Sequence, residues 1–256
     1  MFRRFFTLVL LTMGLALLPA CDTAEERAQA HFEKGASLLE EGEVERALVE
    51  FRNVFKLNGF HKEARLAYAQ VEEERGNVSA AYGQYLRLVE QYPENLEGRR
   101  ALARLASDLN NWEEVTRHVM IAEKLAPKDT MVLAVRSGLD YRNALRDGDT
   151  TAVELAVKVS DSLLAENPDL PAARRVVIDD LLRRQDWPGA LEAIDGGLAI
   201  ESQLSDGPLH LIRDILSQFI RLMAGTAPEF FETGNLKNNR WSTFEQHNLF
   251  FIYRER

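Results

Sequence analysis

The sequence predicts an all-α fold in which helical hairpins stack into a solenoid, and two main observations lead to this expectation. The first is a set of small and aromatic residues that recurs after 34 residues: Gly35, Gly42, Ala47 and Phe51 return as Ala69, Gly76, Ala81 and Tyr85. The second is that no stretch shows the alternation that is typical of a β-strand. A hydrophobic content of 46% provides enough material for a core. A fixed period of this length is typical of a repeat array.

Each recurring phase has a physical reason. Small residues at the eighth position (Gly35, Ala69, Ala103) and alanines at the twentieth (Ala47, Ala81, Ala190) allow two helices to approach within about 8–10 Å. Gly42 and Gly76 are placed to end the first helix of their repeats, because glycine adopts a left-handed backbone at the lowest cost. Bulky residues four positions after the alanine fill the space against the next unit: Phe51, Tyr85 and Ile194. The second helices are expected to stop at prolines: Pro93, Pro127 and Pro168.

These phases resemble tetratricopeptide repeats, and the resemblance covers residues 28–204. It implies a right-handed superhelix of about five repeats, placed at 28–61, 62–95, 96–129, 130–170 and 171–204. Repeat three has Asn110 in place of the turn glycine. Repeat four is longer, because Pro127 and Pro168 lie 41 residues apart, and two extra helical turns would absorb the difference. We expect the extra residues to include the loop "RDGDTT" around Gly148.

The chain beyond repeat five loses the 34-residue phase. Residues 205–225 are apolar on one face and predict an additional helix. Residues 226–256 are rich in asparagine and aromatic residues and form an atypical tail. Three interpretations stay open for this tail: a cap on the solenoid, a disordered segment, or a remnant of lost repeats. We favour a partly ordered tail, because a capping segment normally presents a polar outer face.

The N-terminus has the layout of a secretory signal. Arg3 and Arg4 precede an apolar run over residues 5–18, which is shorter than the roughly 20 apolar residues that span a membrane. The sequence "LPAC" that follows resembles the lipobox of bacterial lipoproteins. That resemblance implies cleavage after residue 20 and lipidation of Cys21, with residues 1–20 as signal peptide and 21–27 as linker. The alternative is an ordinary cleaved signal, with Cys21 as a bystander.

The same resemblance predicts a protein that is anchored by lipid in a bacterial envelope and faces the periplasm. Asp22 resembles the signal for retention on the inner membrane, while the outer membrane stays open. The formal charge is -9, and loss of Arg3 and Arg4 with the signal would make it -11. An acidic chain is a poor match for phosphates, so nucleic acid is not an expected partner.

No catalytic, metal or cofactor site is predicted. The single cysteine excludes an intramolecular disulfide and a thiol metal site, and the five histidines lack metal-ligand spacing. Acidic runs such as Glu72–Glu74, or Asp179 beside Asp180, are expected to form solvated helix faces. We therefore expect that this protein is not an enzyme.

The tetratricopeptide resemblance instead implies a concave groove that accepts a protein or peptide. Its groove positions carry over to eight residues: Phe32, Leu39, Leu66, Gln70, Arg100, Arg104, Arg175 and Asp179. Arg100 and Arg104 lie one helical turn apart, so both could reach one acidic group of a partner. Three arginines at the fourth repeat position are expected to cover helix surface with their stems and to keep their heads in water: Arg65, Arg99 and Arg174.

The chain as a whole resembles the tetratricopeptide lipoproteins of exopolysaccharide export and of exosortase (PEP-CTERM) sorting systems. The segments "ALVEFRNVFKLN" and "EARLAYAQVEEERGN" carry this resemblance. It implies a non-catalytic scaffold that binds protein partners at the membrane. Two alternatives stay open: a lipoprotein that helps to assemble outer-membrane proteins or pilus secretins, and a regulatory subunit of a cell-wall hydrolase. The sequence leaves the oligomeric state open.

Overall fold

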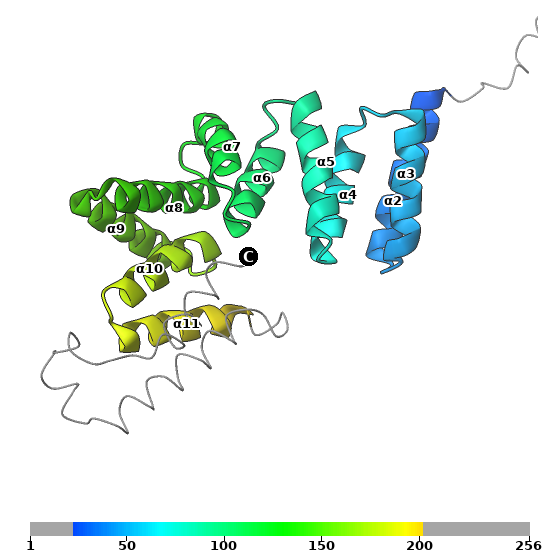
Figure 1. Ribbon diagram of the computed structural model, residues 1–256. Coiled ribbons are helices and arrows are strands. Elements are labelled where there is room, and N and C mark those ends of the chain that lie inside the picture. The colour runs from blue at the N-terminus through cyan, green and yellow to red at the C-terminus, as the bar shows by residue number, and fades with distance from the viewer. Residues whose placement is uncertain (1–22, 202–256) are drawn as a thin grey trace, which may run out of the picture. The chain divides into compact units, whose positions relative to one another are not determined.

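The structure, a computed structural model, describes residues 23–201. The predicted signal peptide, Cys21, the additional helix at 205–225 and the tail at 226–256 lie outside the described residues. Ten α-helices and no strand are found in the described part of the chain (Figure 1). This confirms the all-α fold.

The helices follow one another as five hairpins. The first and second helices of the five hairpins are, in chain order, α2 (Ala24–Glu40) with α3 (Val44–Leu57), α4 (Lys62–Glu74) with α5 (Val78–Gln91), α6 (Leu96–Asp108) with α7 (Trp112–Leu125), α8 (Thr130–Asp147) with α9 (Thr150–Glu166), and α10 (Pro171–Arg183) with α11 (Trp187–Glu201). The chain divides into two compact units, and each is described by itself. The first unit contains α2–α5, and the second contains α6–α11.

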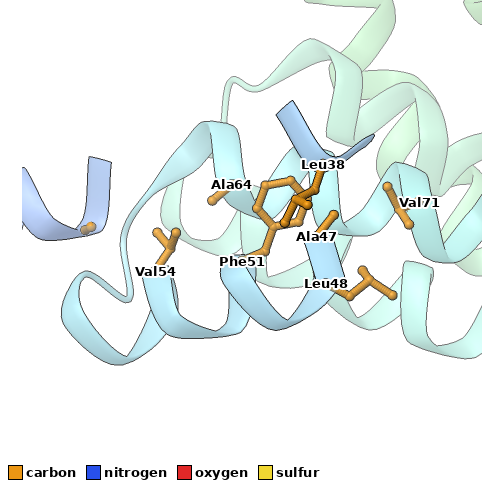
Figure 2. Packing of buried hydrophobic residues seen from close by; sticks show 8 residues of the cluster. Leu38, Ala47, Leu48, Phe51, Val54, Ala64 and Val71 are labelled. Atoms are coloured by element: carbon orange, nitrogen blue, oxygen red, sulfur yellow. The ribbon is translucent and has the colours of Figure 1, made fainter. Parts of the chain in front are cut away.

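The core of the first unit is built around the Phe51 ring, with Leu38 and Ala47 in the same cluster (Figure 2). A side chain at Gly35 would place its Cβ 2.6 Å from Cε1 of Phe51, which is closer than van der Waals contact allows. Gly35 therefore has no space for a side chain, because the ring of the second helix lies directly against its backbone. This confirms the reason for a small residue at the eighth position.

In the second unit, the first helices pack side by side. Helix α8 contacts α6 and α10 as well as α7 and α9. Buried alanines recur where helices meet, including Ala103 on α6, Ala173 on α10 and Ala190 on α11. One buried cluster of this unit is otherwise aliphatic and includes Val115, Val119 and Leu139, while another contains Tyr141.

The turns inside the hairpins use left-handed backbone, as the glycine phase predicted. Gly42 and Gly76 have φ values of 77° and 76°. Asn110 has a φ of 55°, which confirms that it replaces the turn glycine of repeat three. Gln185 has a φ of 63° at the matching turn of the fifth hairpin. A residue with a Cβ is strained in this conformation by about 1–2 kcal/mol.

The ends of the second helices also follow the prediction. Helices α5, α7 and α9 each end two residues before a proline, at Pro93, Pro127 and Pro168. The proline ring disfavours helical backbone at the preceding residue, so the helix stops there.

Two boundaries differ from the expectations. Helix α2 begins at Ala24, inside the range 21–27 that we expected as linker, because Thr23 and Glu26 form a reciprocal capping box. The segment "RDGDTT" is not an extended loop. Helix α8 continues to Asp147 and α9 starts at Thr150, because Gly148 takes the left-handed C-cap and Asp149 caps α9. The extra residues of repeat four therefore lengthen its helices.

Candidate functional site

The candidate site on the first unit consists of side chains on α2 and α4. Phe32 and Leu39 are half-buried and pack against the core of the first hairpin. The Phe32 ring lies 6.1 Å from the ring of Phe51 and 5.0 Å from that of His61, measured between centroids. Leu66 is half-buried and Gln70 is exposed on α4. Leu66 and Gln70 are one helical turn apart and share a face. We name these four residues the first-helix surface.

The predicted arginine pair on α6 has carboxylate partners within the chain. Arg100 Nη1 lies 2.7 Å from Oδ2 of Asp129, whose other oxygen accepts the backbone N–H of Val132 at the start of α8. Arg104 Nη1 lies 3.6 Å from Oδ2 of Asp108. The two guanidinium groups therefore have different acidic partners. Binding one external carboxylate with both stays a prediction, and it would require these ion pairs to rearrange.

The candidate residues on α10 are also used inside the second unit. Arg175 Nη2 lies 2.6 Å from Oδ1 of Asp108, and its Nη1 donates to the carbonyl of Ser107 at 3.2 Å. Asp108 thus joins Arg104 of α6 to Arg175 of α10. Asp179 accepts a hydrogen bond of 2.8 Å from the Tyr141 hydroxyl of α8. Burial, and then the charge of Asp179, raise the pKa of Tyr141. These contacts tie α6, α8 and α10 together.

Two of the acidic residues expected on solvated faces are instead buried. Glu72 accepts a hydrogen bond of 2.6 Å from the side-chain amide of Asn77 in the turn that follows α4. Asp180 lies 3.1 Å from Arg183 Nη2 and 2.8 Å from Arg184 Nε at the end of α10. Each carboxylate therefore helps to close a helix end, so the expectation of purely solvated faces was wrong for these two.

The arginines at the fourth repeat position do not behave as expected. Arg65 and Arg99 are buried, and Arg174 is half-buried. Each donates to the carbonyl six residues before it: Arg65 to Gly59 at 2.6 Å, Arg99 to Pro93 at 3.0 Å, and Arg174 to Pro168 at 2.7 Å. The heads of Arg65 and Arg99 therefore do not stay in water, and the expectation was wrong for these two, whereas Arg174 is only half-buried.

Each of these arginines makes a second contact, with the residue nineteen positions after it. Nη1 of the arginine is the donor, and the partners are Gln84 at 2.8 Å, His118 at 3.0 Å and the carbonyl of Ala193 at 3.1 Å. The guanidinium thus links the loop before the first helix to the second helix of the same hairpin. We name this arrangement the arginine bracket. Its sequence signal was the recurrence of arginine at the phase where the repeat pattern has tryptophan.

The first hairpin uses different residues at the same phase. His31 Nδ1 lies 2.6 Å from Oε2 of Glu50, again nineteen positions later, and Lys34 Nζ lies 2.6 Å from Oε1. The hydrogen bonds from Lys34 and then His31 lower the pKa of Glu50. In this hairpin the bracket position therefore holds a hydrogen-bonded His31–Glu50 pair, beside the ion pair between Lys34 and Glu50.

His118 is 1% exposed, and its ring is held between α6 and α7. Arg99 Nη1 faces its Nδ1, and Oε2 of Glu114 lies 3.1 Å from its Nε2. Because arginine can only donate, Nδ1 accepts and Nε2 carries the proton toward Glu114. Burial, and then the charge of Arg99, lower the pKa of His118. The imidazole is therefore neutral at pH 7.

Two further features concern ligands and membranes. Over residues 23–201, no group of three or more His, Cys, Asp or Glu side chains is arranged to hold a metal ion. The helices within this same range include none with both the length and the apolar character needed to cross a bilayer.

A tetratricopeptide repeat family model matches residues 62–105, which span α4, α5 and most of α6. No curated protein sequence matches the chain.

Several solved structures share the arrangement of helices. A tetratricopeptide repeat protein from Parabacteroides merdae is 13% identical, with a TM-score of 0.53 over 84% of this chain and 81% of that one. A chain of the Cut9–Hcn1 hetero-tetramer of the APC/C is 13% identical, with a TM-score of 0.56 over 88% of this chain and 43% of that chain. A MamA RS-1 double mutant is 16% identical, with a TM-score of 0.50 over 71% of this chain and 98% of that one. At these identities the similarity shows the fold alone. The chain thus carries a tetratricopeptide repeat and has the all-α fold of tetratricopeptide helical hairpins.

Proposed function

We propose that this chain is a non-catalytic scaffold that binds protein or peptide partners and is held by lipid at Cys21 on a bacterial envelope membrane, facing the periplasm. The observation that carries the binding proposal is the first-helix surface of a tetratricopeptide hairpin pair. There, half-buried Leu66 and exposed Gln70 share one face of α4. Helical repeats recognise extended or helical peptides on such faces.

The first-helix surface is a better candidate than the arginines of the second unit. Arg100, Arg104 and Arg175 are already paired with carboxylates of the chain. A partner that displaced those carboxylates would lose one ion pair for each that it formed, so the net gain would be small. Leu66 carries no such cost, because burying its remaining apolar surface is favourable at about 25 cal/mol per Å².

The proposed anchor lies very close to the first hairpin. Cys21 is two residues before Thr23, the residue that caps α2. Two residues span at most about 7 Å, so a lipid on Cys21 would hold the first hairpin near the membrane surface. Each buried methylene contributes about 0.8 kcal/mol, and two or more acyl chains anchor a protein durably. Asp22 favours the inner membrane.

The proposed process is polysaccharide export or protein sorting at the envelope. It rests on the resemblance of the first two repeats to lipoproteins of those systems. In that setting a repeat scaffold at the membrane would gather soluble and membrane proteins around one assembly.

The anchor is tested by metabolic labelling with an alkyne palmitate, followed by membrane fractionation. The wild-type chain is expected to take the label and to sediment with membranes. Cys21→Ser should remove the label and either release the chain to the periplasm or leave an uncleaved precursor. An unlabelled wild-type chain would show that the lipobox interpretation is wrong.

The binding role is tested by recovering partners from detergent-solubilised membranes with the tagged full chain. Leu66→Arg places a charge on the first-helix surface. Leu109→Arg is the matched control, because Leu109 is 57% exposed and lies in the second unit. A partner should be lost with Leu66→Arg and kept with Leu109→Arg, while both variants keep the wild-type melting profile. Equal recovery with the two variants would contradict the proposed surface.

A further inference from the structure

The lengthened fourth hairpin leaves apolar side chains in contact with water. Helix α8 has 18 residues and α9 has 17, whereas the preceding α6 and α7 have 13 and 14. Leu155 is 62% exposed and Val159 is 38% exposed on α9. These two residues are one helical turn apart and form one apolar stripe. The lengthened hairpin therefore carries exposed apolar surface on α9.

A pocket of about 490 Å³ lies beside this stripe, lined by α8, α9 and the end of α7. Its apolar wall consists of Leu133, Ala144, Ala152, Leu155, Ala156 and Val159. Ligand pockets typically measure about 300–1,000 Å³, so this one has room for one or two large side chains. Part of its wall comes from the residues that lengthen the hairpin, such as Ala144 and Ala152. We name it the α8–α9 groove.

The rim of the α8–α9 groove is acidic. Four carboxylates line it: Glu123, Asp140, Asp147 and Asp149. Arg136 is the only basic residue in the lining, and it is shared by two of them. Its Nη1 lies 2.6 Å from Glu123 and its Nε lies 3.0 Å from Asp140. Asp147 pairs at 2.8 Å with Arg146, which lies outside the lining.

Three of the four carboxylates thus pair with two guanidinium groups and Asp149 caps α9, which leaves a surplus of negative charge around an apolar wall. This pattern complements a segment that is apolar and basic. The surplus charge and the chain's net charge of -9 disfavour anionic lipid headgroups and nucleic acid as occupants.

We propose that the α8–α9 groove binds a peptide segment of a partner protein in which a large apolar side chain is flanked by Lys or Arg. The apolar side chain fills the pocket beside Leu155 and Val159, and the flanking cations lie against the acidic rim. This site goes beyond the first-helix surface, because second helices supply much of its wall. It does not depend on that surface, since the first-helix surface belongs to the other unit.

The test measures fluorescence anisotropy of a labelled model peptide with the full chain. The peptide is built from Leu and Lys, with Leu at amphipathic helical spacing, and its matched form has Glu in place of Lys. The Lys peptide should bind more tightly than the Glu peptide. Leu155→Ser should weaken binding about tenfold, because it removes the apolar side chain that the peptide covers. Asp149→Asn should weaken binding about two- to threefold at low salt, because it removes a negative charge from the rim while asparagine can still cap α9.

Leu109→Ser is the matched control, because Leu109 is 57% exposed, close to the 62% of Leu155, and lies outside the groove. A photoreactive form of the Lys peptide should label residues of α8 and α9. Equal binding by Leu155→Ser and Leu109→Ser, or equal affinity of the Glu and Lys peptides, would overturn the proposal. A second copy of this chain is the competing occupant of the α8–α9 groove. Wild-type dimers that dissociate in Leu155→Ser, seen by light scattering, would overturn it as well. The variant Leu66→Arg should bind the model peptide as the wild type does, which separates this site from the first-helix surface.

Discussion

Replacement of Arg99 by methionine tests whether the arginine bracket holds a hairpin together. The Arg99 side chain is 8% exposed, and its guanidinium donates to the carbonyl of Pro93 and to Nδ1 of His118. Methionine keeps an unbranched stem that can fill the same space, but it has no donor. Arg99→Met therefore removes the hydrogen bonds with little change in packing.

The expected cost comes mainly from His118. Pro93 is exposed, so water can replace the lost donor at its carbonyl. His118 is buried, so its Nδ1 is left without a donor, and an unsatisfied buried group costs about 1–3 kcal/mol. Removal of a buried charge offsets part of this cost. We expect Arg99→Met to lower the free energy of unfolding by about 2 kcal/mol, which corresponds to a Tm about 4–8 °C lower for a chain of this size.

Thermal melts at pH 8, followed by circular dichroism, measure this change. Arg117→Met is the control, because Arg117 is 53% exposed and does not donate to Pro93 or His118. Its partner Glu113 is exposed and its partner Glu114 is half-buried. The free energy of unfolding of Arg117→Met should stay within about 0.5 kcal/mol of the wild type. Arg65→Met and Arg174→Met should cost less than Arg99→Met, because their partners Gln84 and Ala193 are half-buried rather than buried. If Arg99→Met melted together with Arg117→Met, the bracket would not stabilise the hairpin and the reasoning would fail.

Three further perturbations test separate parts of the structure. Gln185→Gly should raise the free energy of unfolding by about 1 kcal/mol in urea melts, since it relieves left-handed strain, and a decrease would show that the turn is held in another way. Ala81→Leu should lower the free energy of unfolding by about 1–3 kcal/mol, because Ala81 is fully buried between helices. The control Glu74→Leu should be nearly neutral, because Glu74 is exposed. Equal effects of the two changes would show that the repeat register is wrong. Burial and the charge of Arg99 lower the pKa of His118 in the folded chain. As the pH falls, His118 is therefore protonated in the unfolded chain at a higher pH than in the folded chain. The free energy of unfolding should fall as the pH drops below about 6.5, by at most about 1.4 kcal/mol per pH unit. His118→Gln should flatten the melting temperatures between pH 5 and 7 relative to the wild type, and an unchanged slope would mean that another group titrates there.

The repeat frame could be predicted from the sequence because each of its phases reports a local constraint. The Phe51 ring leaves no space for a side chain at Gly35, and a small residue and a bulky residue recur at these two phases. Asn110 could be identified as the turn residue because asparagine is one of the few residues that tolerate a left-handed backbone. Gln185 could not be identified, since nothing in its side chain signals the same conformation.

The boundaries of the fourth hairpin were harder to predict. The segment "RDGDTT" contains several turn-forming residues, and such a cluster usually indicates a loop. Gly148 and Asp149 alone make the connection, as C-cap of α8 and N-cap of α9. The remaining residues are helical because the lengthened helices pack on each other, a tertiary effect that the local sequence does not report.

The partners of the arginines could not be predicted, because they depend on the three-dimensional packing. An arginine at a repeat phase can cover a helix surface with its stem or donate to a loop carbonyl, and only the approach of the loop decides between the two. Arg104 and Arg175 share Asp108 although they are far apart in sequence. Sequence spacing placed Arg100 and Arg104 on one helix face but gave no information on the carboxylates facing them.

The most direct test of the scaffold proposal is site-specific photo-crosslinking in living cells. A benzoylphenylalanine at position 70, in place of exposed Gln70 on α4, reports what lies against the first-helix surface. The same probe in place of exposed Ser79 on α5 is the control within the same hairpin. We predict a discrete adduct of higher mass, in the membrane fraction, with the probe at position 70 and not at position 79. No adduct at position 70, or the same adducts at both positions, would contradict a scaffold that binds its partners through the first helices.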